Sequence, residues 1–247
     1  MSLQNIFGNP AQLEGYDKNH PLNIYPVLLE KYDAFSDISK FLYVSKNNFA
    51  ETDIPLLQLV LMVHKELGET FESLIDKMCK ALEMVTKSPV GFMDGKDMFA
   101  FVVNNENYIT IANYDEVRKT IMKQNLMYEP KIYKDPEVQK WADKVLRLKR
   151  KKNAPLTLED MVVISKTYQG LTYEQIMKQS LYQLYADFYR ICQFEQYYQT
   201  SLFATVSSEV KIEHFAKNID IYEEGDPYKD LFVSSDKLKG LNEFFNN

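Results

Sequence analysis

Apolar side chains recur at three- and four-residue intervals along most of this 247-residue chain. That spacing places them on one face of an α-helix, so helices must form most of the fold. The clearest case is the segment 71–85, whose apolar face consists of Phe71, Leu74, Ile75, Met78, Leu82 and Val85. The same reasoning predicts helices over 32–45, 54–67, 181–203 and 231–245, and further helices that begin after Asn113, Asp135, Thr157 and Thr172.

The segment 89–112 has a different pattern, in which short apolar runs alternate with turn residues. Asp94-Gly95 and Asn104-Asn105 are the turn signals, and they predict a meander of the strands 90–93, 98–103 and 108–111. An earlier strand over 24–30, with Pro26 confining it to an edge, is expected to join them in one small sheet. The predicted fold class is therefore α+β, mainly α-helical, with a small antiparallel sheet in the first half and a helical second half.

One linker-like segment, KRKKNAP at 149–155, suggests a division of the chain. We predict a polar N-terminal arm over 1–23, an α+β domain over 24–150, and a helical domain over 155–247. The last domain ends in an acidic tail, because the chain from Ser207 onward holds five Lys against nine Asp and Glu.

Composition restricts the classes of function. Hydrophobic residues at 45% and charged residues at 26% are ordinary values for a globular protein. The net charge of −6 makes nucleic acid an unexpected partner. No signal peptide or membrane span is expected, because 1–10 lacks a basic start and an apolar block and no run of about 18 apolar residues occurs. We therefore expect a cytoplasmic protein, with Cys79 and Cys192 as buried, reduced thiols.

The sequence contains no motif that would carry catalysis. His20, His64 and His214 do not have the spacing of zinc ligands, and no glycine-rich phosphate loop or GxSxG motif occurs. We expect no cofactor, no metal, no catalytic residue and no enzymatic activity. The alternative is an enzyme whose site forms only in the folded chain, in a cleft near Trp141.

A basic run extends over 140–152, where seven Lys and Arg stand against Asp143 alone. It could contact nucleic acid or an acidic protein surface through Lys149, Arg150, Lys151 and Lys152. It could equally be a solvated helix end, since cations at a C-terminus suit the helix dipole.

The predicted helix 181–203 carries aromatic residues beyond a single apolar face. The candidates for a protein-binding surface are Tyr182, Tyr189, Phe194, Tyr197 and Tyr198. Packing in the core would explain such residues, and so would a groove or face that binds a partner helix.

Several segments together resemble proteins of tailed phages and prophages of Gram-positive bacteria. They are, in order, a YPV strand, YDxFxxxSKFLYVSKNxF, NYDEVRKTIMKQNL, EPKIYKDPEVQKWADKVL, LTLEDMV and SLYQLYADFYRI. From Tyr114 to about Glu213 the chain is similar to tail assembly chaperones. That resemblance implies a non-enzymatic protein that keeps the tape measure protein soluble until the tail tube forms.

The predicted function is thus that of a phage morphogenesis protein, acting in the host cytoplasm as a tail assembly chaperone or scaffold. Its expected partners are other phage proteins, the tape measure or tail proteins, with a homo-oligomer possible and no membrane involved. The alternative within the same class is a virion structural protein of the neck or tail.

Overall fold

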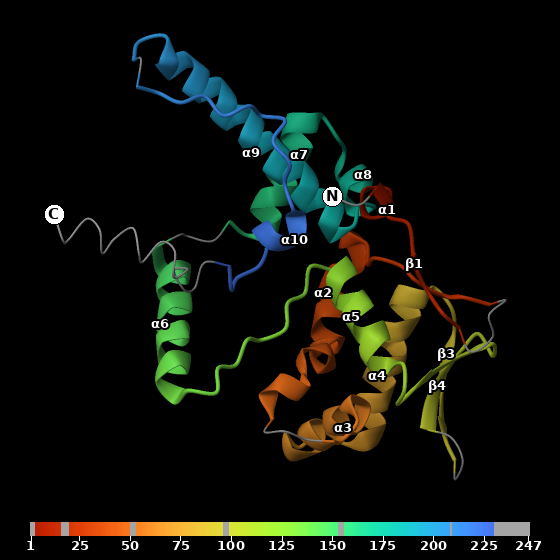
Figure 1. The fold of residues 1–247 in the computed structure, drawn as a ribbon. Coiled ribbons are helices and arrows are strands. Elements are labelled where there is room, and N and C mark those ends of the chain that lie inside the picture. The colour runs from red at the N-terminus through yellow and green to blue at the C-terminus, as the bar shows by residue number, and fades with distance from the viewer. Residues whose placement is uncertain are drawn as a thin grey trace.

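The computed structural model describes residues 3–15, 20–49, 53–95, 99–152, 156–207 and 209–229. Helices dominate it, two small antiparallel sheets lie in the first half, and the second half is helical (Figure 1). The predicted fold class is confirmed.

The N-terminal segment is more ordered than the predicted polar arm. It forms a short helix α1 (Leu3–Ile6) and the strand β1 (Ala11–Leu13), which pairs with β2 (Leu22–Ile24). The expected strand 24–30 is wrong beyond Ile24, because Pro26 has no N–H to donate to a ladder. Helix α2 (Leu29–Ile38) begins five residues later and is followed by the 3-10 turns η1 (Lys40–Tyr43) and η2 (Lys46–Asn48).

Two helices follow close to their predicted positions. They are α3 (Leu56–Glu66) and α4 (Phe71–Thr86). The Thr70 side chain accepts a hydrogen bond from the Ser73 N–H at 3.2 Å, which satisfies one of the free amides at the start of α4. The apolar face of α4 is buried, as its spacing predicts.

The meander is confirmed as β3 (Val90–Asp94), β4 (Phe99–Val103) and β5 (Asn107–Thr110), in antiparallel order. Asn104 and Asn105 both adopt positive φ, at 52° and 58°, as the tight turn between β4 and β5 requires. The expectation of one sheet is wrong, since β1 and β2 form a separate two-stranded sheet. The strand that pairs with β2 is β1, which lies within the segment 1–23 that is predicted, from its polar composition, to be an arm.

From Asn113 to Lys229 the described residues are mainly helical, and several of the helices begin at side-chain caps. The predicted helix over 231–245 lies outside the described residues. The helices are α5 (Tyr114–Gln124), α6 (Pro136–Lys152), α7 (Leu158–Gln169), α8 (Tyr173–Met177), α9 (Leu181–Ala204) and α10 (Ile221–Glu224). Thr157, Thr172 and Ser180 each form a reciprocal capping box with the residue three positions later. Among the described residues, no helix has both the length and the hydropathy needed to cross a membrane.

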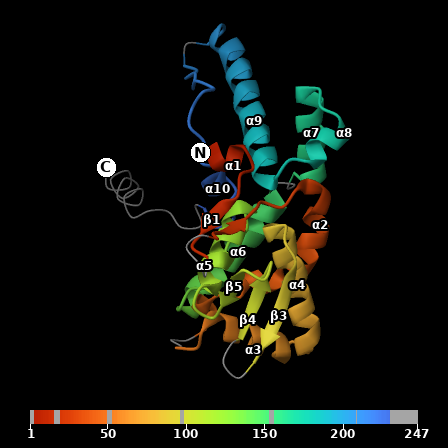
Figure 2. The same ribbon diagram turned by 90° about the vertical axis from the view of Figure 1, so that its right-hand side faces the viewer.

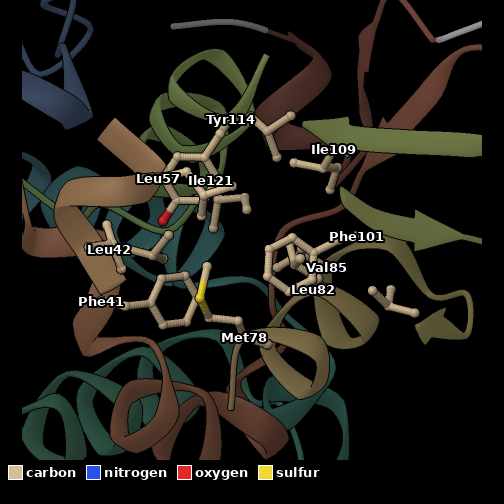
Figure 3. Packing of buried hydrophobic residues seen from close by; sticks show 14 of the residues in the cluster. Phe41, Leu42, Leu57, Met78, Leu82, Val85, Phe101, Ile109, Tyr114 and Ile121 are labelled. Carbon is tan, nitrogen blue, oxygen red and sulfur yellow. The ribbon is translucent and has the colours of Figure 1, made fainter. Parts of the chain in front are cut away.

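The main core lies between α2–α5 and the three-stranded sheet. Phe41, Met78, Leu82 and Phe101 meet there, with Tyr114 and Ile121 of α5 closing one side (Figure 3). Arg118 is also inside, at 1% exposure. Its Nε donates to the Leu42 carbonyl at 2.7 Å and its Nη1 donates to the Glu129 carboxylate.

A second, smaller core joins the two halves of the chain. Leu181 and Tyr182 of α9 pack there with Leu126, Ile219 and Ile221, and Ile6, Leu29, Tyr32 and Tyr128 pack against the cluster. The Leu29 N–H also donates to the Gln179 carbonyl at 2.9 Å. The halves therefore share a core, and the division at 150–155 remains a prediction, with α6 extending to Lys152 and 153–155 outside the described residues.

Candidate protein-binding surface on helix α9

Helix α9 has two parts with opposite environments. Its first turns are held in the second core through Leu181, Tyr182 and Ala186, and Leu184 and Ile191 are buried as well. Its C-terminal half extends away from the body of the molecule (Figure 2). The helix is therefore anchored at one end and presents the other end to solvent.

The projecting end carries large apolar side chains that the protein leaves exposed. The exposed fractions are 57% for Tyr198, 54% for Leu202, 64% for Phe203 and 83% for Val206. Tyr198 and Leu202 stand four positions apart, which places them as neighbours on one face of α9, and Val206 lies in the turn that follows the end of the helix at Ala204. We call these four residues the α9 tip patch.

The tip patch lies in a part of the chain without charge. No Asp, Glu, Lys or Arg occurs between Glu195 and Glu209, although charged residues make up 26% of the sequence. Isolated apolar residues on a surface are common, but a contiguous exposed group without charges is typical of a contact surface.

Below the tip, the chain returns along α9 and covers one side of it. Arg190 Nη1 donates to the Phe215 carbonyl at 2.6 Å and to the Lys217 carbonyl at 3.2 Å. The Phe215 ring lies 5.6 Å from that of Phe194 and 5.3 Å from that of Tyr197. A small cavity of about 320 Å³ remains between the helix and this segment.

The five aromatic residues predicted to bind a partner therefore have different environments. Tyr182 is buried in the second core, so the prediction that it belongs to a binding surface is wrong. Tyr189 donates its hydroxyl to the Glu224 carbonyl at 3.3 Å, and burial raises its pKa to about 12. Phe194 and Tyr197 pack on Phe215, which leaves Tyr198 as the predicted residue in the tip patch.

Leu202, Phe203 and Val206 were not predicted from the sequence. The search for aromatic residues outside one apolar stripe does not reach Leu202 or Val206, because neither is aromatic. The uncharged run from 196 to 208 was the available signal.

The predicted basic contact lies at the C-terminal end of α6. The backbone of Lys149, Arg150, Lys151 and Lys152 continues the helix, and their side chains fall outside the described part of the structure. Trp141, near the predicted cleft, is 61% exposed on the same helix, with Lys144 Nζ 5.1 Å from the centre of its ring.

The two thiols and His64 have structural surroundings. Cys79 is half-buried, and burial raises the pKa of its thiol to about 11. Cys192 is exposed, so the expectation of a buried Cys192 is wrong.

His64 Nδ1 lies 2.6 Å from Glu69 Oε2, and Lys77 donates to the other carboxylate oxygen at 2.5 Å, which joins the end of α3 to α4. Within the described ranges, no group of three or more His, Cys, Asp and Glu is placed to hold a metal ion.

Comparison with known proteins supports a phage origin for the chain. Residues 149–220, which run from the end of α6 through α9 and along the returning segment, match the family model for the second domain of YomV. The SPbeta prophage-derived uncharacterized protein YomV of Bacillus subtilis (strain 168) is 30% identical over 151 residues. That match covers 60% of this chain and 62% of YomV, so the chain spans about three fifths of its relative's length. No solved structure matches the chain.

Proposed function

We propose that this chain is a non-enzymatic phage morphogenesis protein that binds another phage protein through the α9 tip patch. Its role is that of a tail assembly chaperone, and its partner is the tape measure protein. The observation that carries the proposal is the row of exposed apolar side chains formed by Tyr198 and Leu202 on the projecting end of α9 and continued by Val206 in the turn after it.

The partner that suits this row is an amphipathic helix. Side chains at steps of four form a ridge along a helix, and such a ridge packs into the groove between the ridges of a second helix. A long helical protein that has not yet met its final assembly partners exposes an apolar stripe, which makes it prone to aggregate. Covering that stripe with an uncharged helix face would keep it soluble.

The absence of charge fits a partner with a repetitive sequence. A charged surface selects one register and one partner by charge complementarity, whereas an apolar surface of Tyr, Leu and Phe accepts many similar segments. Affinity then comes from apolar burial, at roughly 25 cal/mol per Å² of buried area before the costs of association.

The test is co-expression with the tape measure protein of the phage that encodes this chain. We expect the wild-type chain to keep the tape measure protein in the soluble fraction. The variant Leu202→Ser/Phe203→Ser/Val206→Ser is expected to lose this effect while folding normally, because those residues are exposed. The matched control is Leu67→Ser, which removes a side chain of 76% exposure at the end of α3.

Equal solubility of the tape measure protein with both variants would contradict the assignment of the tip patch. The alternative role, a virion structural protein of the neck or tail, uses the same surface for a permanent contact. It is distinguished by the protein content of purified particles, because a structural protein is present at fixed copy number and a chaperone is absent.

A further inference from the structure

A second surface, separate from the α9 tip patch, concentrates positive charge. Residues 114–152 hold 12 Lys and Arg against six Asp and Glu, a local charge of +6 in a chain whose total is −6. The remainder of the chain therefore carries −12. The total charge of −6 makes nucleic acid an unexpected partner, but it is the sum over a basic segment and an acidic remainder.

The positive segment borders a wide cavity in the described part of the structure. The cavity measures about 1840 Å³ and lies between η2, α5, the connector 127–134 and the segment after α10. Five lysines line it, namely Lys46, Lys119, Lys123, Lys131 and Lys134.

Three acidic residues line the cavity, Asp53, Glu129 and Asp226, and the last two have partners inside the protein. Glu129 accepts from the buried Arg118 guanidinium, and Asp226 lies 3.6 Å from Lys131 Nζ. Lys46 and Lys123 are exposed, and no described carboxylate forms an ion pair with either. With five lysines against three carboxylates, the lining of the cavity has an excess of positive charge.

Helix α6 extends this surface beyond the cavity. The Tyr133 N–H in the cavity wall donates to the Gln139 side chain at 2.9 Å, which fixes the start of α6 against the connector. Lys140, Lys144 and Arg147 are exposed along the helix. Their spacing of four and three places them on one face.

Aromatic rings lie among these cations. Phe49 lines the cavity and is 39% exposed, and Trp141 stands on α6 beside Lys144. Proteins usually bind single-stranded nucleic acid in a groove that combines cationic side chains with exposed aromatic rings. The lysines contact phosphates, and the rings stack on bases.

We propose that the cavity and the exposed face of α6 bind single-stranded nucleic acid. The shape favours a strand over a bilayer, since the lysines Lys46 and Lys123 line a concave surface that a flat membrane would not enter. The apolar side of α6 is also partly occupied, with Ala142 buried and Val138 and Val145 half-buried, so this face is not free to insert into lipid. The exposed rings favour nucleic acid over an acidic peptide.

The test measures binding of a fluorescently labelled oligothymidylate of about 20 nucleotides to the full chain by anisotropy. Trp141 is the one tryptophan in the sequence, so its emission reports binding at α6 directly. We expect binding that weakens steeply with salt, together with quenching of Trp141 emission. The variant Lys46→Glu/Lys123→Glu is expected to weaken binding at least about tenfold. It should also make the salt slope shallower by about 1.4, because each neutralised phosphate accounts for about 0.7 of the slope.

Lys178→Glu controls for simple loss of charge. This exposed lysine lies just after α8, outside the surface, and the variant is expected to bind like the wild type. Trp141→Ala is expected to lower affinity at least about fivefold, because the ring no longer stacks on a base. The triple variant of the α9 tip patch is expected to bind normally, so failure of this proposal and failure of the proposed function are distinguishable.

Three outcomes would overturn the proposal. The first is an affinity that is the same for Lys46→Glu/Lys123→Glu and the wild type. The second is a lack of binding even at low salt. The third is a shift of Trp141 emission by phosphatidylglycerol vesicles or by polyglutamate that exceeds the effect of oligothymidylate, which would assign the surface to a membrane or to an acidic protein.

Discussion

At the scale of single residues, the most consequential side chain is Arg118. It is a charged group inside the main core, and its bonds to the Leu42 carbonyl and the Glu129 carboxylate connect η1, α5 and the connector to α6. Burying a guanidinium is costly unless its donors are matched. Removing it would leave the Leu42 carbonyl unsatisfied and a cavity behind.

We therefore expect Arg118→Ala to lower the free energy of unfolding by about 3 kcal/mol or more, within the range for breaking a buried pair. Urea titration followed by circular dichroism measures this. Lys119→Ala is the control on the neighbouring position, where the side chain is 62% exposed, and its effect should stay within about 0.5 kcal/mol. Equal midpoints for the two variants would contradict the structural role of Arg118.

Glu69 is the residue whose ionisation should couple to folding. Hydrogen bonding from Lys77, with a further contribution from His64, holds the pKa of its carboxyl below the ordinary value of 4.5. Because this pKa is lower in the folded than in the unfolded state, the ionised carboxylate stabilises the fold. That contribution to the free energy of unfolding is fully present above the ordinary pKa, and it is lost as the pH falls through the pKa of the folded state.

The unfolding midpoint of the wild type should therefore fall on acidification below about pH 4.5, and Glu69→Gln should flatten part of that fall. Thermal melts between neutral and strongly acidic pH measure the difference. An acid dependence that is identical in the two proteins would show that this cluster contributes nothing to the folded state.

At the scale of elements, helices could be predicted well and sheet pairing could not. Thr70, Thr157 and Thr172 mark helix starts through local hydrogen bonds, which depend on residues only three positions apart. The pairing of β1 with β2 joins Ala11 to Ile24 across a polar segment, and no periodicity in three residues reveals it. The exposure of Cys192 could not be predicted for a related reason. The spacing of apolar residues shows which face of α9 is apolar, but it does not show how far along the helix that face is covered by the core.

The two parts of α9 should differ in local stability. Its first turns are packed in the second core, while Tyr198 and Leu202 are largely exposed to solvent. Amide hydrogen exchange read by mass spectrometry should therefore be slow over 184–191 and faster over 197–204, since exposed helix ends open at low free energy. Uniform protection along α9 would indicate that something covers the tip, such as a second copy of the chain.

At the scale of the whole molecule, the second core decides how far the halves are independent. Composition marked a linker near 150, yet Leu181 and Tyr182 pack against residues that lie before it, including Leu126 and Leu29. Contacts between segments so far apart in sequence leave no local signature, so the shared core could not be predicted. The sequence singles out α9 through its aromatic residues, and which of its side chains are exposed required the structure.

A fragment of residues 156–247 should consequently fail to fold cooperatively. It would lose the packing of Ile6, Leu29, Leu126 and Tyr128 on α9 and expose the apolar side of that helix. Thermal unfolding followed by circular dichroism is the measurement, with the full chain as control. A sharp transition in the fragment would instead support the predicted independent domain over 155–247.

The proposed function requires the α9 tip patch to contact the tape measure protein. The most direct test places a photo-crosslinking amino acid at position 202 of the chain during phage production, with the same substitution at position 67 as control, and identifies crosslinked peptides by mass spectrometry. We predict crosslinks from position 202 to apolar helical segments of the tape measure protein, and none from position 67. Crosslinks from position 202 only to a second copy of this chain, or to no phage protein, would contradict the claim.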